Sequence, residues 1–229
     1  MKLIKMTILA ATTALTPVKV VAEITARSIF AVDISGTSTF LHDPRSADAA
    51  GAWVEDYVAG LNAPNDLRML SLGDAGLAHR TIDITARVTN MRATSAARLA
   101  PEFGGYFRSL PELAAAGQID VQGTSSILAF FYSLEPACQQ GNVTIVLFTD
   151  GLEWSSAIDG NAFLAGTVGL PTPHRPFLTG CAVIMHGVGQ LKSTFSSDGL
   201  EERLVPEWRA FLDAAGAAPV TITGSGFAF

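Results

Sequence analysis

Apolar residues in this chain fall into two kinds of segment, short continuous runs and longer stretches with helical spacing. The runs 28–32, 143–149 and 181–186 are continuous and rich in β-branched side chains, which is typical of strands buried on both faces of a parallel sheet. In 47–61 and 200–215, apolar residues recur every three or four positions, which predicts amphipathic helices. Strands that alternate with helices favour a doubly wound α/β fold.

The remaining strands complete a predicted six-stranded sheet. Segments 67–72 and 81–88 flank Gly73-Asp74-Ala75-Gly76, whose glycines suit a tight reversal, so we expect an antiparallel hairpin at one edge. Segment 220–223 is the last strand. The prediction is a mostly parallel sheet with one antiparallel edge strand and helices on both faces, in which ligands bind at the carboxyl ends of the strands.

Two further helical segments are predicted between the hairpin and the second buried strand. The first covers 95–116 and is expected to break near Pro101 and Pro111, because proline removes a helical hydrogen bond. The second runs from Thr124 to Leu134, which places Thr124 at a helix start.

Length and composition predict one domain behind an export signal. At 229 residues, with 48% hydrophobic and 16% charged residues, the chain can bury a sizeable core. Lys2 and Lys5 precede a moderately apolar stretch that ends in a small-residue pattern at Ala22. We therefore expect a signal peptide over 1–22, a domain over 23–229 and a periplasmic or secreted location. The alternative is that 1–22 is a strand or helix of the fold.

The charge balance excludes some classes of partner. Removal of 1–22 would change the net charge from −6 to −9, because that segment carries three lysines and no acid. An acidic chain without Lys/Arg runs is unsuited to nonspecific nucleic-acid binding or to anionic membrane surfaces. The apolar stretch is also too short and too polar for stable membrane insertion.

Oxygen-bearing side chains cluster at the predicted strand ends. Asp33, Ser35 and Thr37 follow the first strand, Asp150 follows the run 143–149, and Thr124 begins a predicted helix. If the first and the 143–149 strands are neighbours, both carboxylates can serve one ion. Hard oxygen donors suit Mg²⁺ or Mn²⁺ rather than zinc. Because hydroxyls are neutral, a dication held by them keeps positive character and attracts an outside carboxylate.

The three-part pattern resembles the metal-ion-dependent adhesion site (MIDAS) of von Willebrand factor A (VWA) domains. It consists of Asp33-x-Ser35-x-Thr37, Gly123-Thr124-Ser125-Ser126-Ile127 and Phe148-Thr149-Asp150-Gly151, in family order and spacing. The resemblance covers nearly all of 23–229 and implies a VWA/Rossmann-like fold. Thr37 is a departure, since the family more often has serine there.

By that resemblance, Ser35, Thr37 and Thr124 would be direct or near-direct ligands, and Asp33 and Asp150 would act directly or through water. The implied function is exported, metal-dependent protein binding without catalysis, with a partner's Asp or Glu completing the shell of Mg²⁺ or Mn²⁺. The predicted partner-binding rim consists of His42, Asp43, Arg45, Asp74, Glu153, Trp154 and Lys192.

The two cysteines allow two interpretations. Under the predicted topology Cys138 and Cys181 both lie at the amino end of the sheet, so we expect a disulfide between them if the protein is exported. Otherwise they are two buried thiols that act as small apolar side chains.

Three alternatives to the metal-dependent binding domain remain. The sequence from Asp33 to Thr37 also looks like the D-x-D-G-T loop of haloacid-dehalogenase-like, Mg²⁺-dependent phosphatases, but Ser35 replaces the second acid, which such enzymes need for proton transfer. The domain could be a structural subunit of an envelope or secretion assembly. The same residues could also serve without metal, as caps and turn formers.

Overall fold

The computed structural model describes residues 25–73 and 81–226. Its elements in chain order are β1 (Ala26–Asp33), α1 (Thr39–His42), α2 (Pro44–Ala59), β2 (Asn65–Leu72), β3 (Asp83–Val88), η1 (Arg92–Thr94), α3 (Ala96–Ala115), α4 (Ile127–Ser133), α5 (Glu135–Cys138), β4 (Val143–Phe148), α6 (Gly160–Leu164), β5 (Cys181–His186), α7 (Leu200–Ala214) and β6 (Val220–Thr223). The predicted signal peptide and rim residue Asp74 lie outside the described residues.

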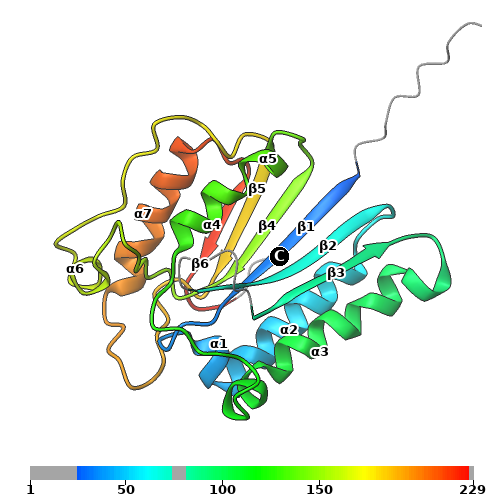
Figure 1. The fold of residues 1–229 in the computed structure, drawn as a ribbon, viewed down its shortest axis with the longest axis horizontal. Helices are drawn as coiled ribbons and strands as arrows, with labels where there is room; N and C mark the ends of the chain where they lie inside the picture. Colours follow the sequence, from blue (N-terminus) through cyan, green and yellow to red (C-terminus); the bar gives the residue numbers. More distant parts are fainter. Residues whose placement is uncertain (1–24, 74–80, 227–229) are drawn as a thin grey trace, which may run out of the picture.

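The sheet has the predicted architecture. Its strand order is β3-β2-β1-β4-β5-β6, and only the β2–β3 pair is antiparallel, with β3 at the edge (Figure 1). The chain builds outward from β1 to β3 and then returns to place β4 on the other side of β1. The strand order therefore reverses between β1 and β4, which is where doubly wound sheets bind ligands. This confirms the predicted fold class, VWA/Rossmann-like α/β.

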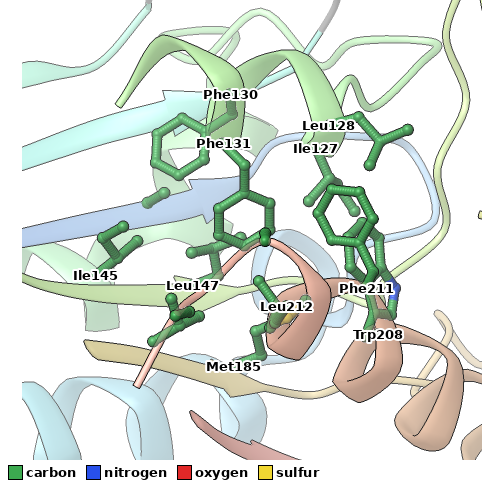
Figure 2. Close-up of a cluster of buried hydrophobic side chains, with 14 of the residues drawn as sticks. Ile127, Leu128, Phe130, Phe131, Ile145, Leu147, Met185, Trp208, Phe211 and Leu212 are labelled. Carbon is green, nitrogen blue, oxygen red and sulfur yellow. The ribbon is translucent and has the colours of Figure 1, made fainter. Parts of the chain in front are cut away.

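Side-chain alternation along β1 divides the core into two layers. Ile29 and Ala31 belong to the cluster under α4 and α7, whereas Phe30 and Val32 belong to the cluster under α2 and α3. Both sets are almost fully buried, as expected for a central strand covered on both faces. Figure 2 shows the first layer, where α4 and α7 side chains meet over Ile145, Leu147 and Met185.

The predicted breaks in the third helix are wrong. α3 runs without interruption through Pro101 and Pro111. Its apolar face is buried against α2 and the sheet, and this tertiary packing outweighs the local cost of each proline, about 3 kcal/mol. At the crossing, a Cβ on Gly51 would lie 2.6 Å from the Gly104 carbonyl oxygen, so only glycine permits so close an approach of α2 to α3.

The amino end of the sheet carries the disulfide. Cys138, at the end of α5, is bonded to Cys181, the first residue of β5, with a Cα–Cα distance of 5.1 Å. The pairing agrees with the sequence prediction. Among the described residues, no helix is long and apolar enough to cross a membrane.

Candidate metal centre

Three loops meet at the carboxyl ends of β1 and β4, beside the reversal of strand order. The loop after β1 pairs with the segment before α4 through Gly36 N–H to Gln122 O (3.0 Å) and Gln122 N–H to Ile34 O (2.9 Å). That segment is joined to the loop after β4 by Trp154 N–H to Ser125 O at 2.9 Å. Main-chain hydrogen bonds thus hold the three parts of the sequence pattern together.

Asp33 is the buried centre of this arrangement. Its Oδ1 accepts from the Ser35 N–H and the Ser125 hydroxyl, both at 2.9 Å, and its Oδ2 accepts from the Thr149 hydroxyl at 2.7 Å. Burial raises the pKa of Asp33, and these hydrogen bonds oppose that rise. Because a carboxylate oxygen has two acceptor positions, Oδ2 is the atom that keeps one available.

Asp150 has a different environment. Its Oδ1 accepts from Leu152 N–H at 2.9 Å, but its Oδ2 is buried with no hydrogen-bond partner among the described residues. Burial, followed by the charge of Asp33, raises the pKa of Asp150 to about 8. Without a counter-charge, this carboxyl group is therefore protonated at neutral pH.

The hydroxyls complete the set. Ser35 Oγ and Thr37 Oγ1 lie 3.1 Å apart and share a hydrogen bond, while Thr124 Oγ1 is buried without a partner in the described part of the chain. Buried polar atoms are normally satisfied, so unpartnered oxygens mark where a cation could bind. Ser126 Oγ and Glu153 Oε1 on the same loops are also unpartnered among the described residues. Among the predicted metal ligands, such atoms belong to Thr124 and Asp150. All the candidate donors are hard oxygens, and the residues present therefore fit Mg²⁺ or Mn²⁺.

The set contains only two carboxylates. Within the described part of the chain, no group of three or more His, Cys, Asp or Glu side chains is arranged to hold a metal ion. Coordination by Asp33, Ser35, Thr37, Thr124 and Asp150 would therefore rest largely on neutral hydroxyls.

The structure changes two details of the predicted site. Thr124 does not start a helix, because α4 begins at Ile127 and residues 123–126 form a loop. Sequence reasoning also missed Ser125 and Thr149, which orient Asp33 through hydrogen bonds. Both lie inside the matched segments, but only the fold reveals that their hydroxyls face Asp33.

The predicted rim residues differ in exposure. Glu153 is completely buried, and its Oε2 accepts from Leu128 N–H at 3.0 Å, near the start of α4, so it is not a rim residue. Burial raises the pKa of Glu153. Trp154 is 39% exposed, and its ring lies so close to Gly160 that a Cβ there would be 2.3 Å from Cδ2.

The other described rim residues lie on the α1–α2 side of the site. His42, Asp43 and Lys192 are partly exposed, and Arg45 is exposed. Lys192 N–H donates to the Thr37 carbonyl at 2.8 Å, which places this group directly beside the candidate metal loop.

No protein-family model and no curated protein matches the chain. Similar solved structures include an aerotolerance-related membrane protein from Bacteroides fragilis with multiple mutations to serines (16% identity, TM-score 0.46, covering 86% of this chain and 90% of that one). Another is the conserved hypothetical protein BatB from Bacteroides thetaiotaomicron (16%, 0.43, 86% and 90%). A third is the SpRpn10 VWA domain (9%, 0.39, 87% and 88%). These TM-scores are too low to carry an argument about family or function, so the fold class rests on the topology.

Proposed function

We propose that this chain is an exported VWA-type domain that binds a protein partner through a divalent cation, without turnover. The observation that supports this most directly is the pair of buried, unpartnered oxygens, Asp150 Oδ2 and Thr124 Oγ1, on two of the three joined loops. The cation proposed is Mg²⁺ or Mn²⁺, and the partner would supply an Asp or Glu carboxylate.

The residues of the proposed site would have different roles. Asp33 is oriented by Ser35, Ser125 and Thr149, so it contributes a fixed negative charge and one available acceptor position. Asp150 and Thr124 would contribute the unpartnered oxygens. The bound ion would supply Lewis acidity toward an outside carboxylate, since hydroxyl ligands leave its charge poorly neutralised.

The location is part of the proposal. A disulfide between Cys138 and Cys181 persists in oxidising compartments, which supports a periplasmic or secreted protein. We propose residues 1–22 as the signal peptide. Mass spectrometry of protein recovered from an exporting host tests this, since cleavage after Ala22 gives a chain beginning at Glu23.

Calorimetry tests the metal site. Titration with Mg²⁺ or Mn²⁺ is expected to give saturable binding to the wild type, and Asp150→Ala and Thr124→Val are each expected to abolish it. Asp48→Ala, at an exposed carboxylate on α2, is the matched control and should bind like the wild type. Acetate added with the metal supplies the missing carboxylate.

Two results would overturn the proposal. One is the absence of metal binding by the wild type even with acetate. The other is hydrolysis of a generic phosphate ester that Asp33→Asn abolishes, which would indicate a phosphatase instead.

A further inference from the structure

A cleft of about 750 Å³ opens beside the candidate metal loop. It lies between the region of α1 and α2, the loop after β5 and the segment after β6; its lining includes His42, Asp43, Arg45, Gln190, Lys192 and Ser225. Its volume lies within the range of about 300–1,000 Å³ typical of ligand sites. The hydrogen bond from Lys192 N–H to Thr37 O joins one wall of the cleft to the loop that carries the proposed metal ligands.

The charge of the cleft is opposite to that of the chain. Arg45 and Lys192 line it, and neither belongs to any ion pair within 25–73 and 81–226. Among the described residues that line the cleft, Asp43 is the one acid, and its carboxylate accepts from Arg45 N–H (3.3 Å), Ser46 N–H (3.1 Å) and Ser46 Oγ (2.7 Å). With Arg45 and Lys192 against Asp43, the described lining of the cleft carries one more cation than anion, in a chain of net charge −6 and on a concave surface where the field is focused.

His42 adds a second polar group. It also lines the cleft, and its Nε2 is buried without a hydrogen-bond partner among the described residues. Burial and the nearby charge of Lys192 lower the pKa of His42, so its ring is neutral at pH 7. His42 therefore adds no charge to the cleft at pH 7.

We propose that this cleft binds an acidic segment of the protein partner, next to the acid that completes the metal shell. The inference rests on the proposed function, because it assigns both contacts to one partner. A peptide suits the cleft better than a single small anion, since the cleft is large and lies beside the metal loop. Two neighbouring contacts also reinforce each other, because the first raises the effective concentration of the second group.

Fluorescein-labelled hexaglutamate is a suitable probe, titrated at low salt in either EDTA or Mg²⁺. In EDTA, the wild type is expected to bind, and Arg45→Gln and Lys192→Gln are each expected to weaken binding about fivefold. Arg92→Gln is the matched control. It removes one charge from an exposed residue after β3, at the opposite end of the sheet, and should change the affinity less than about twofold.

The two conditions separate the two proposals. If hexaglutamate binds the wild type more tightly in Mg²⁺ than in EDTA, and Asp150→Ala abolishes that gain, the result supports the metal contact. If Mg²⁺ gives no gain while the cleft variants still weaken binding in EDTA, the proposed metal function fails and the cleft remains.

Three results overturn the cleft. The first is that hexaglutamate does not bind the wild type in EDTA. The second is that Arg45→Gln and Lys192→Gln bind hexaglutamate as tightly as the control Arg92→Gln does. The third is a pair of results obtained with inorganic phosphate. Calorimetry shows that phosphate binds the wild type and not the cleft variants, and excess phosphate leaves the affinity for hexaglutamate unchanged. Together these would indicate a small-anion site.

Discussion

Asp150 is expected to make the metal-free protein less stable as the pH rises, and Asp150→Asn should remove that effect. The pKa of its carboxyl group is raised from 3.8 to about 8 in the folded chain, by burial and then by Asp33. Between these values the folded state holds a proton that the unfolded state releases. The unfolded state thus binds fewer protons, and the free energy of unfolding falls as the pH rises through this window.

The magnitude follows from the size of the pKa change. Each pKa unit corresponds to 1.36 kcal/mol, so a rise from 3.8 to about 8 limits the loss to about 6 kcal/mol. Over the three units between pH 5 and pH 8, one proton limits the loss to about 4 kcal/mol. Relaxation and water entry weaken electrostatics at buried sites, so we expect a loss of about 2–4 kcal/mol. For a domain of this size, this lowers the melting temperature by roughly 5–15 °C.

Thermal unfolding in EDTA, followed by circular dichroism from pH 5 to pH 8, measures the effect. Asp150→Asn should make the profile less steep and exceed the wild type in stability at pH 8, although it loses the proposed metal site. Asp33 and Glu153, whose pKa values burial also raises, keep part of the slope. Asp48→Asn, at a carboxylate that is 75% exposed, should keep the wild-type slope. Saturating Mg²⁺ should also flatten the wild-type profile. Because burial lowers the pKa of His186 to about 4, that residue acts in the opposite direction below about pH 6.5, and the test is the difference between the two proteins. An unchanged slope in Asp150→Asn would refute the reasoning.

Two further predictions concern stability. Trp208 Nε1 donates to the Gly151 carbonyl at 2.8 Å, so Trp208→Phe leaves that buried oxygen unpaired and should cost about 2–4 kcal/mol in chemical denaturation. Trp154→Phe, at an exposed ring, should cost less than about 1 kcal/mol, and equal losses would contradict the argument. The Cys138–Cys181 bridge spans 43 residues, and replacing both cysteines by alanine should cost about 3–4 kcal/mol, measured by urea unfolding. An unchanged urea midpoint would contradict the loop-entropy argument.

The sequence predicted the sheet well, because central strands buried on both faces leave a plain signal. The segment 181–186 matches β5, and the order of strands and helices fixed which strand ends face the same way. The continuity of α3 could not be predicted, because it depends on packing. Local preference gives a break at Pro101, whereas contact with α2 and the sheet favours an unbroken helix.

The sequence predicted which residues gather at the candidate site, but only part of what each of them does there. Adjacent positions of Asp33 and Asp150 follow from the pairing of β1 with β4. The burial of Glu153 does not follow from any local pattern, since a charged loop residue five positions after the end of β4 is usually exposed. Its burial depends on the approach of α4, whose Leu128 N–H it accepts, and that approach is a tertiary contact.

The main-chain bonds that join the three site loops also bear on how such a domain can diversify. Gln122 pairs with the loop after β1 through its main-chain N–H and its main-chain carbonyl, so this pairing does not depend on the identity of its side chain. Substitutions at exposed neighbours such as Arg45 or Trp154 can therefore alter which surface is recognised while the carboxylates stay in place. Partner choice and ion position would then vary separately, and new specificities could be selected on this framework without rebuilding its centre.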